Sequence, residues 1–132
     1  MPIIRQLRTK NSRILVIDDD QPVRELIACM LLRRGLQVIQ ADSGEKGIDL
    51  ALTANPALIL SDIRMPNMDG FTVIDYLQRD PETVNIPLIL MTGWSDCLNA
   101  ASQLKRGVTV LQKPFDIQML MNSVLAHLDE RP

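Results

Sequence analysis

The chain has few of the residues that build disulfide frameworks and many metal sites. Its 132 residues include two cysteines, Cys29 and Cys97, and one histidine, His127. The cysteines lie far apart in segments of helical pattern, so neither a disulfide framework nor a cysteine-based zinc site is expected. This cysteine usage is typical of a reducing compartment, and we expect a cytoplasmic protein.

Long apolar runs and an excess of one charge are also missing. No apolar run approaches the roughly 20 residues that a membrane-spanning helix needs, and the first residues lack the apolar segment of a signal peptide. Fourteen basic and sixteen acidic residues give a net charge of −2, which provides no domain-wide attraction for nucleic acid or anionic lipid. We therefore expect no nucleic-acid partner and no membrane insertion.

The composition is that of a single globular domain. Apolar residues make up 46% of the chain and charged residues 23%, which excludes a disordered or fibrous protein. The length fits one domain with one core. Residues 1–12 contain Arg5, Arg8 and Lys10 and no acidic residue, and we interpret them as a solvated basic arm. The folded domain is expected over residues 13–132.

Short continuous apolar runs alternate with segments of helical period over this domain. The runs cover residues 14–17, 38–39, 58–60, 88–91 and 110–111. Such runs are typical of parallel strands covered by helices on both faces, because neither side of the strand then meets water. The alternation predicts an α/β fold in which five strands form a parallel sheet.

Five helices are expected to follow the five strands, and each carries signals for its ends. The signals are Pro22 and Gly35 for the first helix, Asp42 or Ser43 and Asn55-Pro56 for the second, Asp80-Pro81 for the third, Ser95 and Gly107 for the fourth, and Asp116 for the last. The last helix carries an apolar stripe at helical spacing, formed by Ile117, Leu120, Met121, Val124, Leu125 and Leu128.

Polar residues follow four of the five expected strands at the same end. Asp18 to Asp20 follow the first strand, Asp62 the third, Thr92 the fourth and Lys113 the fifth. The carboxyl ends of parallel strands meet at one edge of the sheet, where open α/β folds bind ligands. We expect these side chains to converge there.

Carboxylates brought together in this way repel one another unless a cation offsets their charge. An all-oxygen set favours a hard ion, and a site that leaves positions to water and phosphate oxygens favours Mg²⁺ over Ca²⁺. Asp62, on the middle strand, is the carboxylate best placed between the cation, the Thr92 hydroxyl and the Lys113 ammonium. This arrangement suits the acceptance of a phosphoryl group as an aspartyl phosphate.

Four segments in this order resemble the receiver domain of bacterial two-component response regulators, the family that includes the single-domain chemotaxis regulator. The segments are Ile14 to Asp20, Ser61 to Gly70, Leu90 to Gly93 and Lys113 to Phe115. The resemblance extends from Arg13 to the end of the last helix. It implies a three-layer, flavodoxin-like (βα)5 fold with a five-stranded parallel sheet in strand order 2-1-3-4-5.

The resemblance also implies a role for each residue of the expected site. Asp62 is the phosphoacceptor and a metal ligand, Asp18 and Asp19 hold Mg²⁺ with Asp19 as a direct ligand, the Arg64 main-chain carbonyl completes the metal shell, and Thr92 and Lys113 bind phosphoryl oxygens. The peptide bond between Lys113 and Pro114 is expected to be cis. Val110 stands where the family commonly has an aromatic residue.

A signalling module in a phosphorelay is the function that the resemblance implies. Its catalysis would be limited to the phosphorylation and dephosphorylation of its own aspartate, so it is not expected to be an enzyme. The phosphoryl donor would be a sensor histidine kinase or a histidine phosphotransfer protein. The phosphorylated domain would switch its contacts with a downstream protein or form a homodimer, and no DNA-binding output domain is expected after residue 132.

Two other interpretations stay open from the sequence. Ile14 to Val23 also matches the start of haloacid-dehalogenase-like phosphatases, with Asp18 as the nucleophile. That interpretation leaves Asp62 unexplained, and the late paired-aspartate metal motif of those enzymes is missing after Lys113. The other interpretation is a receiver fold that no longer accepts phosphate and serves only as an interaction surface.

Overall fold

The structure, a computed structural model, describes residues 13–93 and 108–129. These residues form nine elements, in chain order β1 (Arg13–Ile17), α2 (Gln21–Leu32), β2 (Gln37–Ala41), α3 (Gly44–Ala54), β3 (Leu58–Asp62), α4 (Gly70–Arg79), β4 (Leu88–Thr92), β5 (Val108–Gln112) and α6 (Ile117–Asp129). The five predicted strands are confirmed. The fourth expected helix, from Ser95 to about Lys105, lies outside the described residues.

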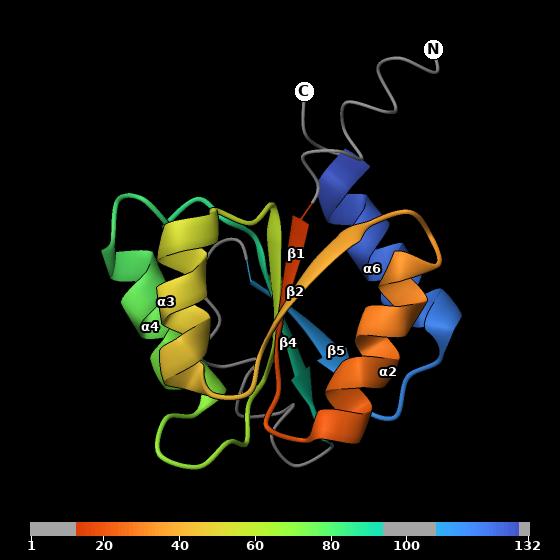
Figure 1. Cartoon of the computed structure of the whole chain (residues 1–132), viewed down its shortest axis with the longest axis horizontal. Helices are drawn as coiled ribbons and strands as arrows, with labels where there is room; N and C mark the ends of the chain where they lie inside the picture. The colour runs from red at the N-terminus through yellow and green to blue at the C-terminus, as the bar shows by residue number, and fades with distance from the viewer. Residues whose placement is uncertain (1–12, 94–107, 130–132) are drawn as a thin grey trace.

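The strands form one parallel sheet in the order β2-β1-β3-β4-β5. Helices α3 and α4 cover one face of the sheet, and α2 and α6 cover the other, which gives three layers (Figure 1). The predicted flavodoxin-like fold and strand order are therefore confirmed. Within the described part of the chain, no helix combines the length and the apolar character that crossing a membrane requires.

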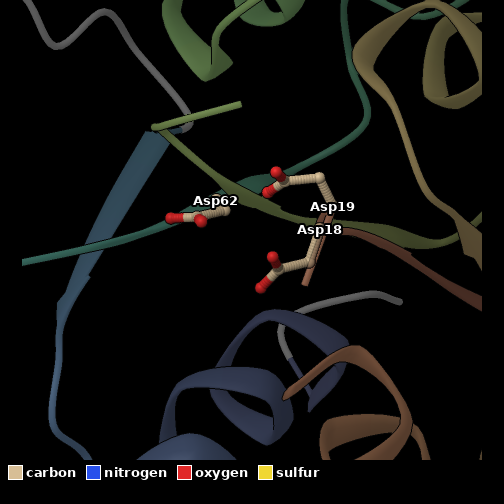
Figure 2. Close-up of side chains that lie close together, drawn as sticks. All are labelled: Asp18, Asp19 and Asp62. Carbon is tan, nitrogen blue, oxygen red and sulfur yellow. The ribbon is translucent and has the colours of Figure 1, made fainter. Parts of the chain in front are cut away.

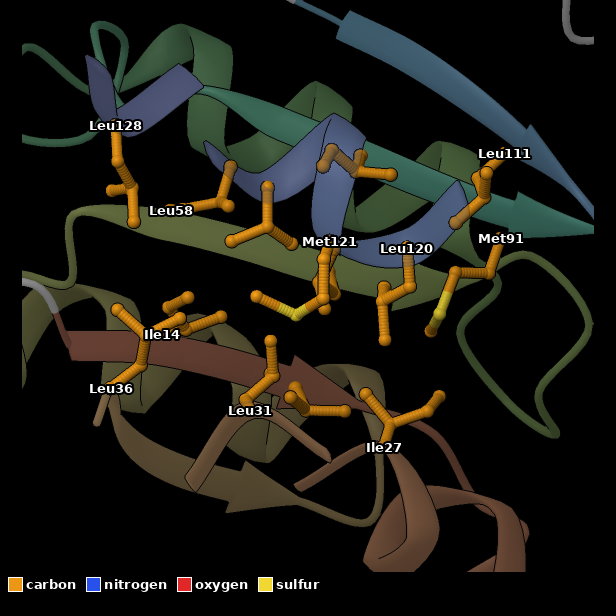
Figure 3. Close-up of a cluster of buried hydrophobic side chains, with 14 of the residues drawn as sticks. Ile14, Ile27, Leu31, Leu36, Leu58, Met91, Leu111, Leu120, Met121 and Leu128 are labelled. Atoms are coloured by element: carbon orange, nitrogen blue, oxygen red, sulfur yellow. The ribbon is translucent and has the colours of Figure 1, made fainter. Parts of the chain in front are cut away.

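The sheet is buried on both faces, which explains its continuous apolar runs. All four residues from Ile14 to Ile17 in β1 are completely buried. Ile14 and Val16 pack in a cluster with α2 and α6 (Figure 3), whereas Leu15 and Ile17 pack in a second cluster with α3 and α4. Because successive side chains of a strand point to opposite faces, one strand stabilises both layers.

The helix ends follow the signals in the sequence. Ser43 rather than Asp42 caps α3, where its hydroxyl accepts a hydrogen bond from the Lys46 main-chain N–H at 3.1 Å. Asp116 caps α6 by accepting from the Met119 N–H at 2.8 Å. These side chains satisfy main-chain donors that the first turn of a helix leaves without partners.

The apolar stripe of α6 is narrower than predicted. Its buried members are Leu120, Met121, Val124 and Leu128, but Ile117 and Leu125 are 40% and 37% exposed. Ile117 lies in the first turn, at the end of the helix, and Leu125 lies at the margin of the stripe. The buried part of the predicted stripe is therefore limited to the other four residues.

Gly70 begins α4 directly against the end of β3. The sequence indicates a glycine that permits a tight turn, but Gly70 is outside the left-handed region, which Gly35 adopts with φ of 84°. A Cβ atom at Gly70 would lie 2.5 Å from the carbonyl oxygen of Asp62 and 2.9 Å from the Cα atom of Ile63. Glycine is required here because the helix approaches the chain of Asp62 too closely for a side chain.

We expect Gly70→Ala to lower the free energy of unfolding by about 1–3 kcal/mol, the usual effect of forcing a methyl group into a packed site. Gly93→Ala is the matched control, because a Cβ atom at Gly93 meets none of the described residues within 4 Å. Urea unfolding of both variants measures the difference. Equal stabilities of the two variants would contradict this account of Gly70.

Candidate functional site

Three carboxylates meet at the carboxyl edge of the sheet. Asp18 and Asp19 follow β1, and Asp62 is the last residue of β3. In the parallel register Ile17 lies opposite Ser61, so Asp18 emerges beside Asp62. One carboxylate oxygen from each of the three residues lies within 4.8 Å of the others (Figure 2). The convergence expected for these residues therefore occurs.

Lys113 brings a positive charge to the same cluster. It directly follows β5, and its Nζ atom lies 3.5 Å from Asp62 Oδ1 and 3.7 Å from Asp18 Oδ2. The Lys113 main-chain N–H donates to the carbonyl oxygen of Thr92 at 2.6 Å, which ties the lysine to the end of β4. The bond between Lys113 and Pro114 is cis, as the resemblance implies.

Main-chain donors hold two of the carboxylates. Asp18 Oδ1 accepts from the Asp20 N–H at 3.0 Å, and Asp62 Oδ1 accepts from the Ile63 N–H at 2.9 Å. The second oxygen of Asp18, Oδ2, is buried and has no hydrogen-bond partner within residues 13–93 and 108–129. At 3.7 Å the Lys113 ammonium is too far to form a hydrogen bond with it, although the two charges attract. A buried acceptor is therefore left for another donor or a cation.

Burial raises the pKa of two of these carboxyl groups. For Asp18, loss of solvent is the largest cause, and the hydrogen bond from Asp20 and the charge of Lys113 act against it. Loss of solvent also raises the pKa of Asp62, against the lowering effect of Lys113. The folded protein without a cation therefore binds protons more tightly at these residues than the unfolded chain does.

Thr92 is the last residue of β4, and Arg64 lies on the connection that follows β3. Thr92 is buried at the end of β4, and its hydroxyl donates to the Gly93 carbonyl oxygen at 3.3 Å. Arg64 is exposed on the connection after β3. It contributes to an open pocket of about 540 Å³ whose lining residues are Ile63, Arg64, Met65, Pro66, Asp69 and Phe71. The roles expected for Thr92 and for the Arg64 carbonyl stay predictions.

The carboxylate cluster fits a magnesium ion. Oxygen ligands lie about 2.1 Å from Mg²⁺, so two ligand atoms on opposite sides of the ion are about 4.2 Å apart. The observed limit of 4.8 Å between the carboxylate oxygens is close to this span, and small side-chain movements would close the difference. The partnerless Asp18 Oδ2 atom supports the same conclusion, because a buried carboxylate oxygen without a donor is unfavourable unless a cation neutralises it.

One residue that contacts the acidic segment was missed by the sequence analysis. Arg24 in α2 donates from Nη1 to the main-chain carbonyl oxygen of Asp18 at 2.8 Å. The only signal in the sequence is a basic residue six positions after Asp18, which does not distinguish this contact from a solvated helix face.

Comparison with known proteins identifies the family. Residues 14–125 match the model of the response regulator receiver domain. The chain is 33% identical over 118 residues to protein PilH of Pseudomonas aeruginosa, a match that covers 89% of this chain and 98% of PilH. It is 38% identical over 117 residues to the DNA-binding dual master transcriptional regulator RpaA of Synechocystis sp., covering 88% of this chain and 48% of RpaA. A solved structure of a putative response regulator from Chloroflexus aurantiacus aligns with a TM-score of 0.83 at 28% identity, covering 90% of this chain and 98% of that one.

The chain belongs to the response regulator receiver domain family of two-component systems, as the resemblance predicted. Receiver domains are signalling domains that interact with histidine kinases or phosphotransfer proteins and bind Mg²⁺ at an acidic cluster. Here such a cluster is formed by Asp18, Asp19 and Asp62. The family match gives no support to the phosphatase interpretation. The chain spans about half the length of RpaA.

The raised pKa values predict how stability depends on pH in the absence of divalent cations. Between the ordinary pKa of an aspartate, 3.8, and the raised pKa of Asp18, the folded state binds more protons than the unfolded state. Stability contributed by this group is therefore lost as the pH rises. We expect Asp18→Asn to be more stable than the wild type in EDTA at pH 7, and the advantage to shrink towards pH 4.

Chemical unfolding at several pH values measures this difference. Asp49→Asn is the matched control, because it removes one negative charge from an exposed position on α3. A stability difference between wild type and Asp18→Asn that does not change with pH would contradict the expected linkage.

Proposed function

We propose that the chain is a phosphoacceptor that receives a phosphoryl group on Asp62 in the presence of Mg²⁺ and thereby switches its protein contacts. The observation that carries this proposal is the cluster of Asp18, Asp19 and Asp62 with the Lys113 ammonium 3.5 Å from Asp62. Anionic and cationic groups are combined in the way that transfer of a charged phosphoryl group requires.

Asp62 is the acceptor that this arrangement favours. Its side chain is 15% exposed, whereas that of Asp18 is completely buried. Asp62 also lies near both the Lys113 ammonium, at 3.5 Å, and the two carboxylates that would hold Mg²⁺, so an incoming phosphoryl group would meet positive charge from the lysine and from the bound ion. Asp18 and Asp19 would hold the ion, and the Arg64 carbonyl would add a further oxygen.

The proposed transfer is a nucleophilic displacement at phosphorus. A carboxylate oxygen of Asp62 forms the new O–P bond while the P–N bond of a phosphohistidine breaks, and the released imidazole takes up a proton. Bound Mg²⁺ supplies positive charge that offsets the negative charge of the transferring oxygens. The Lys113 side chain donates to a phosphoryl oxygen, and the Thr92 hydroxyl turns from Gly93 to donate to another.

The proposed donor is a sensor histidine kinase or a histidine phosphotransfer protein in the cytoplasm. Phosphorylation would shift the equilibrium between two conformations of the domain that present different surfaces. It would thereby change the affinity of the domain for a downstream protein or for a second copy of the chain. A coupling of about 1–3 kcal/mol between the phosphoryl group and the partner is typical of such switches. We assign this function to residues 13–132 and none to the basic arm, residues 1–12.

Intact mass after incubation with Mg²⁺ and acetyl phosphate tests the proposal. We expect a single phosphate adduct on the wild type, which disappears in EDTA and in Asp62→Asn, because the acceptor or the cation is then missing. Asp18→Asn should slow adduct formation by at least about tenfold, the usual effect of weakening a metal site.

Asp49→Asn serves as the matched control and should form the adduct at the wild-type rate. An unmodified wild type with normal Mg²⁺ binding would contradict the proposal and favour a receiver fold that acts only as an interaction surface. An adduct that persists in Asp62→Asn and vanishes in Asp18→Asn would instead identify Asp18 as the nucleophile.

A further inference from the structure

Arg24 joins the acidic segment to the edge strand of the sheet. Its Nη1 atom donates to the Asp18 carbonyl oxygen at 2.8 Å, and its Nε atom donates to Oε1 of Gln40 in β2 at 3.0 Å. The Asp18 main-chain N–H donates to the carbonyl oxygen of Ala41 at 3.1 Å. Both main-chain polar groups of Asp18 are thus tied to the end of β2, one directly and one through Arg24.

The contact to the Asp18 carbonyl also affects Asp19. The carbonyl group of Asp18 and the amide of Asp19 belong to one planar peptide unit, so a donor that fixes the first also fixes the second. Asp19 is exposed, and no hydrogen bond within residues 13–93 and 108–129 holds its carboxylate. The direction of the Asp19 side chain therefore depends on the main chain that precedes it.

We propose that Arg24 is a positioning residue for the Mg²⁺ site. By fixing the peptide plane between Asp18 and Asp19, it directs the two carboxylates towards Asp62, on the neighbouring strand. Arg24 acts through the main chain, because its hydrogen bonds go to a carbonyl and to an amide oxygen and not to a carboxylate. This inference rests on the proposed function, since it concerns how the cluster holds its cation.

The sign of the effect on Mg²⁺ affinity separates positioning from electrostatics. A guanidinium next to the cluster repels a divalent cation, so removal of its charge alone should strengthen Mg²⁺ binding. Loss of positioning should weaken it, because the carboxylates must then be ordered when the ion binds. The two explanations therefore predict opposite changes for the same substitution.

Isothermal titration calorimetry of the full chain with Mg²⁺ measures the change in Mg²⁺ affinity. We expect Arg24→Ala to weaken Mg²⁺ binding about tenfold, in the range found for residues that orient metal ligands. Arg24→Lys should recover part of the affinity, because an ammonium can still donate to the Asp18 carbonyl but cannot bridge to Gln40 with the planar fork of arginine. Arg34→Ala, which removes the same charge from an exposed position after α2, should bind Mg²⁺ as the wild type does.

Thermal unfolding in EDTA accompanies each titration and identifies a merely structural role. A lower melting temperature with unchanged Mg²⁺ affinity would overturn the inference, as would tighter binding in Arg24→Ala. If Arg24→Ala does not fold, Gln40→Ala and Arg24→Lys test the inference in its place. The Gln40 side chain is exposed, so Gln40→Ala should still fold. Unchanged Mg²⁺ affinity in both variants would overturn the inference.

The proposed function can fail separately from this inference. A wild-type chain that binds no Mg²⁺ would overturn both. A wild type that binds Mg²⁺ and forms the Asp62 adduct, together with an Arg24→Ala variant of unchanged affinity, would overturn only the role of Arg24.

Discussion

The repulsion among three carboxylates at one edge of a buried sheet is the interaction on which the rest of this structure depends. The parallel register of β1 and β3 brings Asp18 beside Asp62, so the strands fix the main-chain positions from which the two carboxylates extend. Charges repel more strongly in a partly desolvated site than in water, because the effective dielectric constant is lower. Burial is the largest cause of the raised pKa values of Asp18 and Asp62, and the charges of the neighbouring carboxylates add to it.

The surrounding fold offsets the cost in two ways. The two apolar clusters on either face of the sheet hold β1 and β3 in register, since a slip by one residue would turn every buried side chain to the wrong face. At the edge itself, Lys113 and the main-chain N–H groups of Asp20 and Ile63 supply partial compensation. One oxygen of Asp18 receives no hydrogen bond from the part of the chain that the structure describes, so the compensation there is incomplete until a cation binds.

Much of this arrangement is predictable from the sequence, because it depends on the order of elements. Asp18, Asp62 and Lys113 each follow an apolar run, and parallel strands bring such positions to one edge whatever the details of packing. Contacts that depend on packing are different. The Arg24 contact with Gln40 joins residues 16 positions apart and leaves no periodic signal. The requirement for glycine at position 70 is another such contact, since the close approach of α4 to Asp62 is visible only in three dimensions.

The central claim is that the folded domain carries an uncompensated carboxylate cluster that a divalent cation relieves. Its most direct test is the melting temperature of the wild type at pH 7 as a function of Mg²⁺ concentration, starting from EDTA. The account predicts that the melting temperature continues to rise as the Mg²⁺ concentration exceeds the dissociation constant. At a Mg²⁺ concentration one hundred times the dissociation constant, the free energy of unfolding should be larger by about 2.7 kcal/mol. A melting temperature that is the same in EDTA and in saturating Mg²⁺ would contradict the account.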